Sequence, residues 1–147
     1  MTNNNIYFIA NWKMYGNLNS LNSVKKVIKL SNKKKFKKAK IIYCPPYTLL
    51  NDFSQLTKNT RIITGAQNCH EEEFSGPFTG FVSPHMIASL GVKYIIIGHS
   101  ENRSMGETNL SINKKIISSI KQKLKIFFCI GETLKEKKRK QTSYILK

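Results

Sequence analysis

Short runs of apolar residues recur along the chain, and each run ends at a glycine or a polar cluster. The runs cover residues 6–10, 41–44, 62–63, 94–97 and 126–130. Residues 94–97 show no alternation of apolar and polar positions, as is typical of strands covered on both faces in parallel α/β sheets. The pattern therefore predicts five buried, parallel strands.

Amphipathic helices are predicted between these strands, because apolar residues return there at spacings of three and four. The predicted helices cover residues 18–28, 46–56, 84–91, 109–120 and 134–145. Ser83 before Pro84 is a typical helix start, and Thr133 with Glu136 has the spacing of a capping box. The helix over 109–120 is expected to carry one apolar stripe of Ile112, Ile116, Ile117 and Ile120.

The repeated unit of buried strand, polar tip and helix predicts βαβ units around a parallel sheet, an α/β fold. No linker or low-complexity segment divides the chain. We therefore expect one architectural unit over residues 1–147.

Polar residues follow the strands, and in a parallel sheet the strand tips lie on one rim, where ligands gather. A lysine, an amide and a histidine on one rim can hold an anion and polarise a carbonyl beside it. The pattern suits a small phosphorylated carbonyl compound. The alternatives to a functional role are that His99 is satisfied by local hydrogen bonds and that Lys13 faces solvent. The rim residues are Asn11, Lys13, Gln67, Asn68, His99, Glu101, Cys129 and Glu132.

Composition adds a strong positive charge to this picture. The 147 residues are 40% hydrophobic and carry 25 Lys and Arg against eight Asp and Glu, a formal net charge of +17. Such a charge attracts nucleic acid, anionic membranes or phosphorylated small molecules. The lysines are spread along the chain and no nucleic-acid recognition module is found, so a broad codon bias is the preferred interpretation. The basic stretch at 33–40 is interpreted as a solvated turn, with an anion-binding patch as the alternative.

The cysteines and the known cofactor motifs point to a reduced compartment and to cofactor-free chemistry. Cys44, Cys69 and Cys129 form no CxxC pair and have no histidine at metal-ligand spacing, so we expect a cytoplasmic protein without a metal. No dinucleotide fingerprint, P-loop, HExxH or GxSxG occurs, so no cofactor is expected. No secretory signal or membrane span is visible, so a soluble protein is expected.

Several segments, taken together and in order, resemble the triosephosphate isomerase family. They are ANWKM at 10–14, GAQN at 65–68, FTG at 78–80, SP at 83–84, IIGHSE at 96–101 and CIGETL at 129–134. The resemblance implies an incomplete (β/α)₈ TIM barrel of about five units, with parallel strands and outer helices. It also implies interconversion of dihydroxyacetone phosphate and D-glyceraldehyde 3-phosphate, a step of glycolysis and gluconeogenesis.

The resemblance also implies roles for individual residues. Asn11 and Lys13 would bind the triose phosphate substrate, and Lys13 would supply positive charge to the developing enediolate. His99 would be the electrophile, a neutral imidazole that donates a hydrogen bond to the substrate carbonyl. Glu101 would pair with Lys13, and Cys129 would have a supporting place near the site. Thr79 would lie at the tip of a loop that reaches the partner subunit of a homodimer.

The chain departs from the family in two ways. Asn102 and Phe81 stand where an arginine and a glutamate are usual, and the spacing from His99 to Glu107 is one residue short, so the dimer geometry is in question. A full barrel takes about 250 residues, and no residue matches the general-base glutamate that follows the sixth strand. We therefore expect a fragment truncated after the fifth strand and its helix, inactive alone. The alternatives are a basic nucleic-acid-binding protein and another phosphate-binding barrel enzyme.

Overall fold

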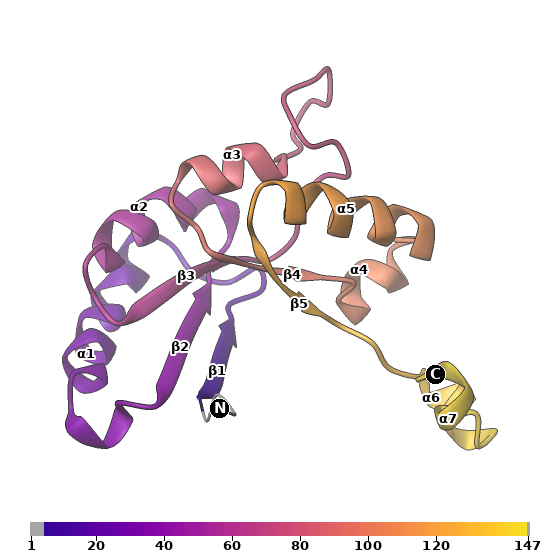
Figure 1. Ribbon diagram of the computed structural model, residues 1–147, viewed down its shortest axis with the longest axis horizontal. Coiled ribbons are helices and arrows are strands. Elements are labelled where there is room, and N and C mark those ends of the chain that lie inside the picture. The colour runs from indigo at the N-terminus through magenta and orange to yellow at the C-terminus, as the bar shows by residue number, and fades with distance from the viewer. Residues whose placement is uncertain (1–4, 147) are drawn as a thin grey trace.

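The computed structural model describes residues 5–146, so residues 1–4 and 147 of the predicted unit lie outside the described part. Its centre is a parallel sheet whose strands follow one another in chain order. The sheet curls into an open half-barrel (Figure 1). This arrangement confirms the predicted parallel α/β fold. The strands are β1 Ile6–Asn11, β2 Ala39–Cys44, β3 Ile62–Ala66, β4 Tyr94–Ile97 and β5 Lys125–Phe128.

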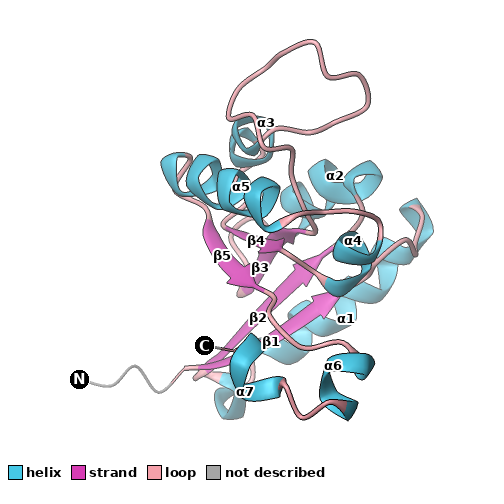
Figure 2. Cartoon of the chain, turned by 90° about the vertical axis from the view of Figure 1, so that its right-hand side faces the viewer, coloured by secondary structure: helices cyan, strands magenta, loops and turns pink. Residues whose placement is uncertain are grey.

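Helices cover the convex side of the curled sheet (Figure 2). The described helices are the 3₁₀ turns η1 Leu18–Ser20 and η2 Lys34–Phe36, and α1 Leu21–Ser31, α2 Tyr47–Thr57, α3 Pro84–Ser89, α4 Ser100–Ser104, α5 Asn109–Lys121, α6 Leu134–Lys138 and α7 Thr142–Ile145. The predicted caps are present: the Ser83 side chain accepts from the Met86 N–H, and Thr133 and Glu136 form a capping box. None of the helices in residues 5–146 is long and apolar enough to cross a membrane.

The core lies on both faces of the sheet. On the concave face, Ile42, Tyr94 and Ile96 pack together, and all three are buried. On the convex face, β4 meets α3 and α5 through Ile95 and Ile97, which have no exposed surface. Fully burying one such side chain contributes roughly 1.5–3 kcal/mol. β4 is thus the most completely buried strand of the described sheet. The residues that follow it are therefore attached to a rigid element.

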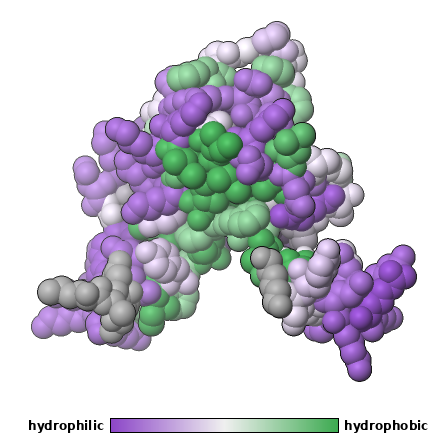
Figure 3. Space-filling view, turned by 45° about the vertical axis from the view of Figure 1, so that its right-hand side comes forward, coloured by the Kyte–Doolittle hydropathy of each residue, from purple (hydrophilic) through white to green (hydrophobic). Residues whose placement is uncertain are grey.

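The two edge strands are much less covered than β4. Phe8 on β1 and Phe128 on β5 are 54% and 51% exposed. β1 and β5 each have one neighbour in the described sheet. Figure 3 shows hydrophobic side chains gathered in the middle of one face, between polar lobes. Exposed apolar edges of this kind are sites of association.

Two sequence predictions for the helices were wrong in detail. Ile117 and Ile120 are 49% and 59% exposed, whereas Ser118 and Ser119 are buried. Small serines let α5 approach the sheet closely, so the buried face is rotated from the predicted isoleucine stripe. The predicted helix over 134–145 is also two short helices, because Lys140 adopts a left-handed φ of 58° between them, a conformation that interrupts a right-handed helix.

Candidate functional site

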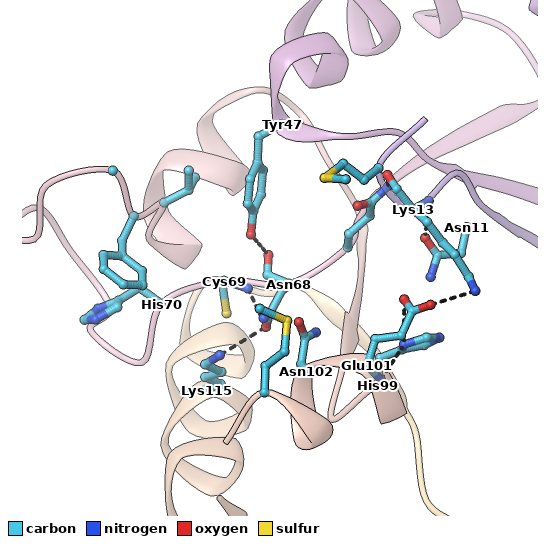
Figure 4. A pocket seen from close by; sticks show the side chains of 16 residues that line it. Asn11, Lys13, Tyr47, Asn68, Cys69, His70, His99, Glu101, Asn102 and Lys115 are labelled. Carbon is cyan, nitrogen blue, oxygen red and sulfur yellow. Dashed lines mark hydrogen bonds and ion pairs between the residues drawn. The ribbon is translucent and has the colours of Figure 1, made fainter. Parts of the chain in front are cut away.

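A cleft of about 440 Å³ opens at the carboxyl ends of β1, β3 and β4. Figure 4 shows side chains from these strand ends and from the following loops pointing into it. The cleft thus occupies the rim at which the sequence predicted a site. Among the predicted site residues, its lining includes Asn11, Lys13, Gln67, Asn68, His99 and Glu101.

The backbone of Lys13 is held in an unusual conformation just after β1. Its φ is +52°, in the left-handed region that non-glycine residues seldom adopt. The Asn11 side chain accepts a hydrogen bond from the Lys13 N–H at 2.8 Å, and the Gln67 amide donates to the Lys13 carbonyl at 2.9 Å. Gln67 also donates to the Cys44 carbonyl at 2.8 Å. Asn11 and Gln67 therefore fix the turn from which the Lys13 side chain projects.

The Lys13 ammonium pairs with the Glu101 carboxylate across the cleft. Their Nζ and Oε1 atoms are 2.7 Å apart, and each side chain is about half exposed. The hydrogen bond from Lys13 and its positive charge lower the pKa of Glu101. The same hydrogen bond and the carboxylate charge raise the pKa of Lys13. The pair keeps one cation and one anion at the mouth of the cleft.

His99 is the N-cap of α4, at the point where β4 delivers the chain to the rim. Its Nδ1 accepts a hydrogen bond from the Glu101 N–H at 3.3 Å. In a neutral imidazole an accepting Nδ1 leaves the proton on Nε2. The nearer Glu101 carboxylate oxygen lies 3.4 Å from Nδ1, and with Nδ1 acting as an acceptor this contact carries no hydrogen bond. The geometry thus favours an imidazole with a donor N–H free for a ligand.

A second polar cluster at the deep side of the cleft was missed by the sequence analysis. Lys115 pairs with Glu107 and donates to the Asn68 Oδ1 atom at 3.2 Å. The side chains of Lys115 and Glu107 are only 12% and 6% exposed. Glu107 Oε2 is buried with no hydrogen-bond partner among the described residues. Tyr47 donates to the Asn68 carbonyl, and burial raises the pKa of Tyr47.

Nothing in the local sequence marks this second cluster. Charged residues on an amphipathic helix are normally solvated. In this lysine-rich chain, nothing in the sequence around Lys115 distinguishes it from the exposed lysines. Its burial results from contacts between segments that are far apart along the chain, since Asn68 lies 47 residues away.

Cys129 and Glu132, also predicted at the rim, are not part of the cleft lining. Cys129 packs against the concave core, and its carbonyl accepts from Arg103 at 3.3 Å. Burial raises the pKa of the Cys129 thiol. Glu132 accepts a hydrogen bond from the Thr142 hydroxyl at 3.1 Å. β5 ends beside β4, where the Cys129 N–H donates to the Ile97 carbonyl at 2.9 Å, but no residue of β5 or of the segment after it lines the cleft.

The long loop 69–82 projects from the body of the molecule (Figure 2). Thr79 is exposed on this loop, between Phe78 and Phe81 in the sequence. At the base of the loop the His70 ring lies between Phe78 and Phe81, with ring centroids 4.4 and 4.9 Å apart. Phe81 and Asn102, the two departures from the family pattern, both line the cleft.

The cleft offers polar donors and two amines, those of Lys13 and Lys115. Within residues 5–146 there is no group of three His, Cys, Asp or Glu side chains able to hold a metal ion. The ammonium groups and the polar donors of the cleft are suited to hydrogen bonding and to holding an anion.

Comparison with known proteins points to one family. The sequence model of the triosephosphate isomerase family matches residues 6–147. Triosephosphate isomerase from Dictyoglomus thermophilum is 43% identical over 139 residues, which are 93% of this chain and 55% of that protein. The Clostridium tetani enzyme is 40% identical over 138 residues, 93% of this chain and 53% of that protein.

A solved structure gives the same result. The crystal structure of triosephosphate isomerase from Bartonella henselae matches with a TM-score of 0.87 and 31% identity, over 95% of this chain and 57% of that one. The chain thus spans about half the length of the relatives it matches.

Proposed function

Because this chain belongs to the triosephosphate isomerase family, we propose that it is the amino-terminal part of an enzyme that interconverts dihydroxyacetone phosphate and D-glyceraldehyde 3-phosphate. The observation that carries the proposal is the grouping of Lys13, His99 and Glu101 around one cleft. Lys13 follows β1, and His99 and Glu101 follow β4; catalytic residues of TIM-barrel enzymes come from the ends of several strands. In this proposal the enzyme is one domain and needs neither cofactor nor metal.

Each cleft residue has a defined task in the proposed reaction. The His99 Nε2–H donates to the substrate carbonyl oxygen, and so stabilises the charge that develops there as a proton leaves the adjacent carbon. The Lys13 ammonium attracts the phosphate and offsets the negative charge of the enediolate. Asn11 and Glu101 position Lys13, and the Asn11 amide hydrogens remain available to the substrate. Cys129 supports the strand end beside Gly98.

A base is still needed to take the proton from carbon. Glu101 is occupied by Lys13 and Glu107 by Lys115, so neither carboxylate is free to act. General acid–base catalysis contributes typically about 10²- to 10⁴-fold. We therefore expect this chain by itself to bind the substrate without turning it over.

The proposal is tested by separating binding from turnover. Phosphorus-31 NMR titration with dihydroxyacetone phosphate should show binding that weakens in Lys13→Met and persists in Lys135→Met, an exposed lysine of α6. A coupled isomerase assay on the same chain should show no turnover. Turnover that disappears in His99→Gln would overturn the assignment of a missing base, and equal binding by both lysine variants would overturn the role of Lys13.

Loop 69–82 is the proposed contact with a second subunit. The exposure of Thr79 and the projection of the loop from the body support this proposal. In sedimentation velocity, Thr79→Arg should lower the dimer fraction, whereas Asn22→Arg on α1 makes the same charge change elsewhere and should not. Equal dimer fractions in the two variants would count against the loop as the contact.

The free thiols of Cys44, Cys69 and Cys129 support a cytoplasmic location.

A further inference from the structure

The end of the sheet opposite the cleft is formed by the segments that lead into the strands. Segments 32–40, 58–61, 91–93 and 121–125 precede or begin β2, β3, β4 and β5. Because these strands are parallel, the four segments lie at the same end of the sheet. We call this set of segments the amino-terminal rim.

Hydrogen bonds connect neighbouring segments of the amino-terminal rim. Arg61 donates through Nη2 to the carbonyls of Phe36 and Lys37 at 3.0 and 2.9 Å, which ties 58–61 to 32–40. The Lys93 N–H donates to the Thr64 carbonyl at 3.2 Å, and the Lys125 N–H donates to the Lys93 carbonyl at 2.9 Å. Segments far apart in sequence therefore form one continuous surface.

The charge on the amino-terminal rim has a single sign. Nearly half of the lysines and arginines of the chain fall in these four short segments, and none of its acidic residues does. Lys121 is within 4 Å of a carboxylate, that of Glu73 at 3.3 Å; no other rim cation has such a contact within residues 5–146. The rim cations are Lys33, Lys34, Lys35, Lys37, Lys38, Lys40, Lys58, Arg61, Lys93, Lys121, Lys123 and Lys125.

A polar groove of about 530 Å³ lies in the middle of this surface. Lys58 and Lys93 are exposed on its lining. Ammonium groups are common protein partners of phosphate oxygens. The groove thus offers a recessed anion position between the lysines of 32–40 and those of 121–125.

From this arrangement we propose that the amino-terminal rim binds the phosphodiester backbone of a nucleic acid. A row of cations across several segments matches a ligand with many regularly spaced charges, whereas a small phosphate would engage only a few of them. Within residues 5–146, Lys121 alone of these cations has a carboxylate within 4 Å. A membrane surface fits less well, because none of the large hydrophobic residues in the four segments is exposed, so no apolar group is available to insert into lipid. The proposal is independent of the isomerase cleft at the other end of the sheet.

The proposal can be tested by fluorescence anisotropy with a labelled single-stranded oligonucleotide of mixed sequence, measured over a range of salt concentrations. The rim variant is Lys34→Gln/Lys35→Gln/Lys37→Gln. Its matched control, Lys135→Gln/Lys137→Gln/Lys138→Gln on α6, removes the same charge from exposed positions outside the rim. If three phosphate contacts are lost, the slope of log K against log salt should fall by about 2 in the rim variant. The control should keep the slope of the unaltered chain.

Three outcomes would overturn the proposal. Equal weakening in both triple variants would mean that net charge alone drives binding. Binding to phosphatidylserine vesicles at physiological salt, without binding to the oligonucleotide, would assign the rim to membranes instead. Circular dichroism checks that both variants are folded. Photo-crosslinking of a 4-thiouridine oligonucleotide to the unaltered chain gives a separate readout, with cross-linked peptides expected in the four rim segments and the proposal contradicted if they map elsewhere.

Discussion

Lys13 combines an unusual backbone conformation with a charged contact in the cleft. Its left-handed backbone is fixed by Asn11 and Gln67, while its side chain meets Glu101. The sequence analysis placed these residues on one rim because parallel strands end together. It could not foresee the left-handed turn, since lysine has no preference for that conformation. The turn results from two side-chain hydrogen bonds, one of them from a residue 54 positions away.

The first residue-scale prediction concerns the titration of Glu101. Its carboxyl should titrate below the ordinary glutamate value of about 4.3, because Lys13 donates to the ionised form. A lowered folded-state pKa gives a stabilisation that is present above the unfolded value and is lost as pH falls through the folded one. The raised pKa of Lys13 acts in the opposite sense, with stabilisation lost as pH rises through it.

The measurement is a carbon-13 NMR titration of the Glu101 carboxyl. Lys13→Met should return its pKa toward the ordinary value, and Lys26→Met on α1 should leave it lowered. A Glu101 pKa that does not respond to Lys13→Met would show that the pair does not persist in solution.

The second residue-scale prediction concerns the buried pair of Glu107 and Lys115. Removing one partner leaves a charge buried without compensation, so Glu107→Ala should lower the free energy of unfolding by about 3 kcal/mol or more. Lys115→Met should have a similar effect, and the double variant should lose less than the sum of the two. Urea denaturation measures all three.

The exposed pair of Lys114 and Glu71 is the control for this cycle. Its members are 54% and 27% exposed, so Lys114→Met should cost less than about 1 kcal/mol. Additive losses at Glu107 and Lys115 would mean that the two groups do not interact energetically.

At the scale of elements, the apolar runs and caps predicted where strands and most helices begin. Such signals are local, because a strand covered on both faces must be apolar and a first turn needs acceptors for its N–H groups. The orientation of α5 and the break between α6 and α7 were not predicted. They depend on how closely a helix approaches the sheet and on what lies beside it, which Ser118, Ser119 and Lys140 do not reveal locally.

The element-scale prediction concerns the start of α5. The Thr108 hydroxyl accepts from the Ser111 N–H at 3.2 Å, so Thr108→Ala should lower the free energy of unfolding by about 1 kcal/mol. Thr108→Ser keeps the acceptor and should retain most of the stability. Thermal unfolding with hydrogen exchange over residues 109–112 gives the comparison, and equal losses in the two variants would argue against capping.

At the scale of the whole molecule, apolar edges and positive charge act against each other. Exposed Phe8 and Phe128 favour association between copies, whereas a net charge of +17 opposes it. Salt screens the repulsion and leaves the apolar attraction in place. Association should therefore increase with salt, the opposite of the trend expected for nucleic-acid binding at the amino-terminal rim.

Light scattering coupled to size exclusion at low and high salt measures this whole-molecule prediction. Phe8→Lys places a charge on the free edge of β1 and should reduce the oligomer fraction at high salt. Leu110→Lys makes the same change at an exposed position of α5 and should have little effect. A chain that stays monomeric at every salt concentration would contradict the prediction.

The order of the strands also bears on how this molecule acquires its shape. Each strand pairs with the one before it in the chain, so every step of sheet growth closes only a single strand–helix–strand connection. The loop-closure entropy of each connection rises only slowly with its length. Ribosomes add about 5–20 residues per second, so each new unit emerges on a timescale of seconds. The half-barrel can therefore assemble stepwise during synthesis, with every finished strand serving as the template for the next.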